Sequence, residues 1–205
     1  LALFDVDAAS IQRAMARVEV ATARWAQQQG QTANALRHFE AAKRIVATEV
    51  EDSEIKPRYT ALYHSVLFEL TDLYLNQRNT QKAQRACLDA LESFQLAMSR
   101  HPLRPDFIEG HMTAQILLGN AYEAAEDVDR ALAAYEAAEV DHQKLLATLF
   151  QGEVYSENLV TAQVNRARLL RQQGEIEQAE GVLEYARALA SRLVQTLGQR
   201  PRILR

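Results

Sequence analysis

The chain contains few residues whose types and spacing could carry out catalysis. Its 5 histidines and 1 cysteine are scattered along 205 residues. None of the histidines stands at a recognised metal-binding spacing from a Cys, Asp or Glu residue. The sequence also lacks a glycine-rich phosphate loop and a Gly-x-Ser-x-Gly nucleophile motif. We therefore predict no catalytic residue, no metal ligand and no cofactor, and we expect that the protein is not an enzyme.

Three arginines form a first candidate for a binding site. Arg166, Arg168 and Arg171 lie close together in the sequence, and guanidinium groups bind carboxylates through paired hydrogen bonds. An acidic peptide or a carboxylate is the ligand that this cluster favours.

An acidic segment precedes these arginines. Residues 105–152 hold nine acidic residues against Arg130 and Lys144, a net charge of −7 in a chain whose total is −4. Two interpretations stay open: a solvated convex face, or a docking patch for a basic partner.

The composition predicts a helical, cytoplasmic protein. With 7 Gly and 4 Pro, the chain has little loop material. Its negative net charge argues against nucleic-acid binding, and no apolar run approaches the ~20 residues of a membrane span. The single cysteine indicates a reducing compartment. The short, acidic start is unlike a signal peptide, and because it lacks Met we expect a piece of a longer protein.

The residues are organised by an internal repeat of 48 residues. Four sets of residues, each spaced by 48 and here named columns, share a residue type: alanine in two, small residues in the third, and mostly large apolar residues in the fourth. These columns are Ala35/Ala83/Ala131/Ala179, Ala42/Ala90/Ala138/Ala186, Ala23/Thr71/Gly119/Ala167 and Phe39/Cys87/Tyr135/Leu183.

Prolines mark where the repeats begin. Pro57 and Pro105 are also 48 apart, and proline suits the first turn of a helix. They define repeats 1 to 4 as residues 9–56, 57–104, 105–152 and 153–200, within one domain covering 1–205. Residues 201–205 would start a further helix or form a tail.

Each repeat has the pattern of two helices joined by a turn. The turns are expected near Gly30, Asn79, Asp127 and Gly174, because glycine tolerates the left-handed conformation that ends a helix. Thr80 and Asp127 are candidate caps of the helices that follow.

Several further residues fit the helical core of such repeats. Ile11, Met15 and Val18 are spaced along one face of a first helix. Trp25 shares a column with Leu73 and Leu169, which predicts that it is buried. His111, His142 and Cys87 also share columns with apolar residues, so packing explains them better than ligand binding or nucleophilic attack.

The third repeat resembles the tetratricopeptide repeat (TPR). Leu118, Gly119, Tyr122, Ala131 and Tyr135 fall on its motif positions. Two positions depart from the motif, because Gln115 stands where it has Trp and Gln143 where it has Pro. The resemblance implies an all-α fold, a right-handed α-solenoid of four antiparallel helix hairpins.

The period departs from the 34 residues of that family. The excess of 14 residues gives each helix seven more, about two turns, and seven residues return a helix to nearly the same face. We therefore predict a long-helix variant of the repeat. Similar spacing occurs in arrays attached to bacterial signalling proteins.

The resemblance also implies where a partner binds. In that family the first helices line a concave surface that binds extended peptides or partner helices. The matching residues here are Arg17, Val20, Arg24, Gln27, Phe68, Asp72, Leu75, Asn76, Ile116, Asn120, Glu123, Val164, Arg168 and Arg171.

This set contains one apolar and one polar column. Val20, Phe68, Ile116 and Val164 are apolar in all four repeats, and the column that begins with Arg24 is polar in all four. The apolar column has an alternative interpretation, namely that it packs neighbouring first helices together. The polar column could be solvated only.

These observations lead to two hypotheses about function. The first is a protein–protein interaction scaffold that binds a peptide or partner helix on its concave face, as one module of a larger bacterial signalling or regulatory protein. The alternative is a structural module that stacks end to end into a homo-oligomer through exposed solenoid ends.

Overall fold

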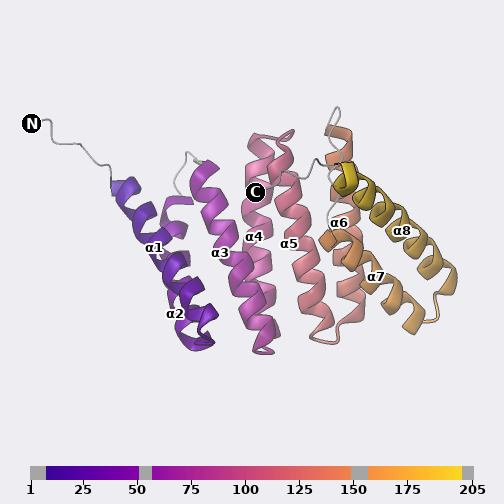
Figure 1. The fold of residues 1–205 in the computed structure, drawn as a ribbon, viewed down its shortest axis with the longest axis horizontal. Coiled ribbons are helices and arrows are strands. Elements are labelled where there is room, and N and C mark those ends of the chain that lie inside the picture. The colour runs from indigo at the N-terminus through magenta and orange to yellow at the C-terminus, as the bar shows by residue number, and fades with distance from the viewer. Residues whose placement is uncertain (1–7, 51–56, 149–156, 200–205) are drawn as a thin grey trace, which may run out of the picture. The chain divides into compact units, whose positions relative to one another are not determined.

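The described part of the chain is entirely helical. The computed structural model describes residues 8–50, 57–148 and 157–199, so the residues at 201–205 lie outside the described part. Within it no strand is present. Successive helices form antiparallel hairpins (Figure 1). The helices are α1 (Ala8–Gln28), α2 (Thr32–Val50), α3 (Pro57–Asn76), α4 (Thr80–Arg100), α5 (Pro105–Glu123), α6 (Val128–Thr148), α7 (Glu157–Gln172) and α8 (Ile176–Gln199).

The helix starts follow the sequence pattern. The prediction that proline opens first helices is confirmed for α3 and α5, which begin at Pro57 and Pro105. The second helix of every repeat begins 48 residues after the previous one, at Thr32, Thr80, Val128 and Ile176.

The turns between paired helices share one geometry. A residue two or three positions after the end of each first helix has a positive φ, of 71° at Gly30, 57° at Arg78, 60° at Glu126 and 86° at Gly174. In each turn the next amide bonds back five residues, as from Asp127 N–H to Tyr122 O at 2.9 Å. This is the hydrogen bond of a Schellman motif.

Two details of these turns differ from the sequence prediction. The left-handed residues of the second and third turns are Arg78 and Glu126, one position before the predicted Asn79 and Asp127. Asn79 instead caps α4, because its Oδ1 accepts a hydrogen bond from Lys82 N–H at 3.2 Å. The prediction of Thr80 as that cap is therefore wrong, whereas Asp127 caps α6 through Arg130 N–H as predicted.

The chain divides into two compact units, residues 1–93 and 94–205. The first holds α1 to α3 and most of α4, and the second holds the end of α4 with α5 to α8. The boundary lies inside a helix and not between repeats. That all four repeats act as one domain stays a prediction.

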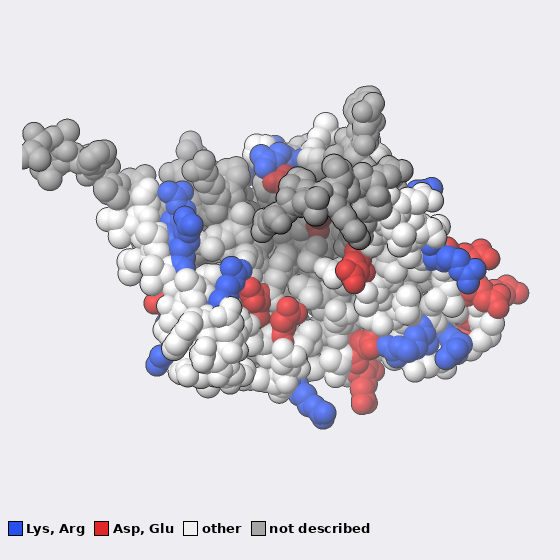
Figure 2. All heavy atoms as spheres, in the orientation of Figure 1, with Lys and Arg blue, Asp and Glu red and all other residues white. Residues whose placement is uncertain are grey.

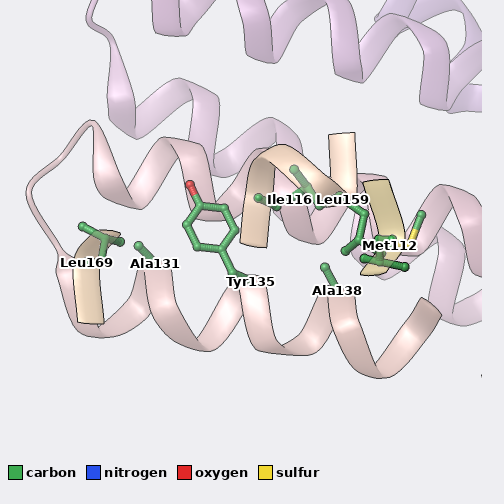
Figure 3. Close-up of a cluster of buried hydrophobic side chains, with 9 residues drawn as sticks. Met112, Ile116, Ala131, Tyr135, Ala138, Leu159 and Leu169 are labelled. Atoms are coloured by element: carbon green, nitrogen blue, oxygen red, sulfur yellow. The ribbon is translucent and has the colours of Figure 1, made fainter. Parts of the chain in front are cut away.

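The core of the second unit explains the residue sizes that the columns have in the third repeat. Ala131, Tyr135 and Ala138 lie along one face of α6 and share a core cluster with Ile116 of α5 and with Leu159 and Leu169 of α7 (Figure 3). The Tyr135 ring occupies the space beside Gly119, where an added Cβ would lie 2.5 Å from a ring carbon. Small and large side chains therefore alternate across this hairpin.

In the first unit, different residues form the equivalent contact between paired helices. At the positions of Gly119 and Tyr135 it has Thr71 and Cys87 in α3 and α4, both fully buried. The Thr71 hydroxyl lies 3.5 Å from Cys87 Sγ. A larger side chain on the first helix is thus matched by a smaller one on the second.

The first helix departs from the predicted core. Ile11, Met15, Val18 and Trp25 are largely exposed, although the sequence pattern predicts that they are buried. The reason is that no described hairpin precedes α1, so this face of the first helix has nothing to pack against. The prediction that Trp25 is a core residue is therefore wrong.

Candidate interaction faces on the first helices

In the first unit, polar groups join the two first helices. Arg24 of α1 donates a hydrogen bond from Nε to Glu69 Oε1 of α3 at 3.0 Å and another to Ser65 Oγ at 3.4 Å. The Arg24 side chain stays half exposed. This pair holds one cation and one anion at the surface, and both remain accessible to a partner.

Apolar and acidic groups continue this face along α3. Phe68 and Leu75 are partly buried, whereas Asp72 and Asn76 are exposed. Partial desolvation and the nearby Glu69 carboxylate raise the pKa of Asp72 above its usual value. The face therefore combines half-covered apolar side chains with charges of both signs.

In the second unit, several residues of the predicted binding surface take part in a hydrogen-bond network within the protein. The Tyr135 hydroxyl donates to Asn120 Oδ1 at 2.8 Å or to Glu123 Oε2 at 3.1 Å. Arg168 of α7 donates to the other oxygen of Glu123. Burial and the Glu123 carboxylate raise the pKa of the Tyr135 phenol. Asn120 and Glu123 therefore tie α5 to α6 and α7.

The predicted arginine cluster is divided by the structure. Arg166 is mostly buried and pairs with Glu139 Oε2 of α6 at 2.7 Å, and Arg168 pairs with Glu123. Arg171 is exposed. The three guanidinium groups thus do not form one common site for an acidic peptide.

The remaining predicted residues are distributed between core and surface. Val20 and Ile116 are buried, at 6% and 5% exposure, whereas Val164 of α7 is 46% exposed. Arg17 is exposed and Gln27 partly buried. The burial of Val20 and Ile116 agrees with the alternative that this column packs first helices together.

The acidic charge of the third repeat is largely matched inside the second unit. Asp127 pairs with Arg130, and Glu139 with Arg166. On the surface around α7 and α8, acidic and basic side chains lie next to each other (Figure 2). A docking patch for a basic partner therefore finds little support here.

Buried hydrogen bonds of two histidines were not predicted from the sequence. His111 Nδ1 of α5 lies 2.5 Å from Asp141 Oδ2 of α6, and Lys144 Nζ approaches the other oxygen at 3.2 Å. His142 is fully buried, with its Nδ1 2.9 Å from the Tyr185 hydroxyl. Packing of both histidines was predicted, but the polar partners lie 30 or more residues away and no short-range signal reveals them.

Two other kinds of site are absent from the described residues. No group of three or more His, Cys, Asp or Glu side chains is placed to hold a metal ion there. None of the described helices is long and apolar enough to cross a membrane.

Comparison with known proteins identifies the fold. No family model and no curated protein matches the chain. Among solved structures, the apo form of RapI matches with a TM-score of 0.71 and 12% identity over 88% of this chain. BtubC (BKLC) from P. vanneervenii matches with a TM-score of 0.70 and 20% identity over the whole chain.

These likenesses concern the fold alone. The chain spans 44% of the RapI chain and 71% of the BtubC chain. A kinesin light chain from Podosopora anserina with TPR-like repeats also matches, at the lower TM-score of 0.40. The protein is built of TPR-like helical repeats in an all-α solenoid fold.

Proposed function

We propose that the protein is an interaction scaffold whose first helices bind a peptide or a partner helix. The observation that carries this proposal is the face of α1 and α3. There the partly buried Phe68 and Leu75 lie on the same helix as the exposed Asp72, beside the accessible Arg24–Glu69 pair. Apolar groups with a charged surround are the usual composition of a peptide-binding surface.

The chemistry of this face defines the partner segment. Phe68 and Leu75 are seven residues apart on α3, two helical turns, so they suit two apolar side chains of a helix or an extended strand. Arg24 and Asp72 favour an acidic and a basic group beside them. The face of α7 in the second unit, with Val164, Arg168 and Arg171, is a second such surface.

Peptides selected from a random display library provide the test, because they require no knowledge of the natural partner. We expect Phe68→Ala to weaken the binding of selected peptides at least tenfold, since central apolar anchors dominate such interfaces. Arg24→Ala should weaken it less and make it less sensitive to salt. Titration calorimetry measures both effects.

Leu88→Ala is the matched control for Phe68→Ala. Leu88 is 42% exposed on the second helix α4, away from the proposed face, so its substitution should leave affinity unchanged. If no peptide is selected, or if Phe68→Ala and Leu88→Ala have equal effects, the face does not bind peptides.

We further propose that this scaffold is one module of a larger bacterial signalling or regulatory protein in the cytoplasm. Support comes from the 48-residue spacing, which resembles long-helix arrays attached to such proteins. The acidic net charge of −4 and the buried Cys87 thiol, whose pKa burial raises to about 12, suit a cytoplasmic protein without nucleic-acid partners.

A further inference from the structure

One face of α1 is built like an internal contact but has no neighbour in the described structure. Met15, Val18 and Trp25 are 54%, 64% and 59% exposed. All three residues lie on α1, the first helix of the first repeat. Together these three side chains form an exposed apolar patch, whose contact with water is unfavourable.

The counterparts of these residues in the fourth repeat are buried. Leu159, Ala162 and Leu169 of α7 are 0%, 1% and 2% exposed. They belong to the core cluster that also contains Ile116 of α5 and Tyr135 of α6. In the second unit, therefore, this face of a first helix packs against the preceding hairpin.

Among the described residues, the opposite side of the fourth repeat also has no neighbouring hairpin. Val164 of α7 and Leu183 of α8 are 46% and 47% exposed. They stand 48 residues after Ile116 and Tyr135, which are buried in the core cluster. The fourth repeat thus presents the apolar positions that, in the third repeat, receive α7.

A hollow lies beside α1 at the same exposed face. It has a volume of about 490 Å³ and is lined by residues that include Met15, Ala41 and Ile45. The corresponding residues of the fourth repeat are Leu159, Tyr185 and Leu189, which all pack in or against the core cluster.

Polar groups at the two faces are also partly complementary. In the second unit Gln173 Nε2 donates to Asp129 Oδ1 at 3.1 Å. The equivalent residues on the two free faces are Gln29, 144 positions before Gln173, and Glu177, 48 positions after Asp129, and both are exposed. An amide and a carboxylate would meet there in the same way.

One pair opposes association. The contact between Arg168 and Glu123 has Arg24 and Arg171 as its counterparts, which are two cations. Arg24 is already paired with Glu69 of its own unit, which reduces the repulsion. Because salt screens like charges and leaves apolar burial intact, association through these faces should strengthen with ionic strength.

We propose that a second copy of this chain docks head to tail, with α1 of one copy packed against α7 and α8 of the other. The contact reuses the arrangement between the third and fourth repeats: Met15, Val18 and Trp25 take the places of Leu159, Ala162 and Leu169. Because the two faces differ, the interface is heterologous and leaves one free face on each end of a pair.

The test uses one variant for each face. Val18→Glu combined with Trp25→Ala blocks the α1 face, and Leu183→Glu blocks the α8 face. We expect the unchanged chain to associate as its concentration rises in sedimentation experiments, and each variant alone to stay at 23.1 kDa. An equimolar mixture of the two variants should form a species of twice that mass, because each supplies the face that the other lacks.

Trp25 gives a second readout. It is the only tryptophan, so the α1-face variant has none and the emission of the mixture comes from the Leu183→Glu chain alone. Adding the α1-face variant should shift that emission to the blue as the indole becomes buried, and more strongly at 0.5 M than at 0.05 M salt. Leu88→Glu is the matched control, since the other repeats have Glu at this position, and it should associate like the unchanged chain.

Every outcome decides the proposal. A monomer at all concentrations and salt levels overturns it. If each variant still associates alone, or if the mixture stays monomeric although the unchanged chain associates and circular dichroism shows both variants folded, the contact is not head to tail. Doubling of mass in the mixture together with the blue shift supports it.

Discussion

Ionisation of His64 should make the stability of the protein depend on pH. It is buried in α3, and burial lowers its pKa from 6.5 to about 3. Below pH 6.5 the unfolded chain therefore binds a proton that the folded protein does not. The free energy of unfolding should fall as pH decreases from 6.5 toward 3, by about 1.4 kcal/mol per pH unit.

Replacement of this histidine tests the effect directly. The third repeat has the fully buried Met112 at the position of His64, so His64→Met should fit. Between pH 7.5 and 5 the unchanged protein should lose roughly 2 kcal/mol more stability than this variant, measured by urea unfolding. His101→Gln, at an exposed position, is the control. Equal pH dependence of the unchanged protein and His64→Met would contradict the prediction.

Single residues were predictable where packing alone decides their place. Burial of Cys87, His111 and His142 followed from the apolar residues in their columns. The partners of the buried polar groups did not, because Asp141 and Tyr185 meet the histidines only through tertiary packing. The prediction that Trp25 is buried was wrong for a different reason. Its column predicts a contact, but the neighbour that would make the contact is absent from the described residues.

At the scale of helices, the match of small with large side chains gives a second prediction. Gly119→Thr alone should be destabilising, because a side chain there meets the buried Tyr135 ring. Tyr135→Cys alone should leave a cavity. The double variant copies the pair Thr71 and Cys87 of the second repeat, and we expect it to be about 1–3 kcal/mol more stable than the sum of the two single effects.

A double-mutant cycle of urea unfolding measures this coupling. Gly181→Thr is a control, because a Cβ added at Gly181 in α8 would have no neighbouring residue packed against it within 4 Å. Additive effects of the two substitutions would show that the hairpin does not depend on the matched sizes.

Helix positions could be predicted well from the sequence because proline, small residues and apolar spacing agree at this scale. The left-handed turn residues Arg78 and Glu126 were missed, since neither type favours positive φ. Asn79 and Asp127 are of types that adopt a positive φ more readily. They lie one position later in the turn and cap the helices that follow. The candidate faces were only partly predictable, because the same helix positions serve partner binding and packing between helices.

At the scale of the whole molecule, two kinds of surface differ in composition. The faces of the first helices carry mixed charges and half-covered apolar groups, which suit a peptide. The free ends of the repeat series carry the apolar positions of an internal contact. Elsewhere acidic and basic side chains pair with one another, as Glu139 does with Arg166 and Glu123 with Arg168.

The central claim is that a partner binds on the first helices. Hydrogen exchange of the protein with and without a saturating selected peptide tests it most directly, because amide protection reports which helices are covered. We expect slower exchange in α3, around Phe68 to Leu75, and in the facing part of α1, with α2 and α4 little changed. Protection confined to α2 and α4, or to the outer face of α1 around Met15 and Val18, would contradict it.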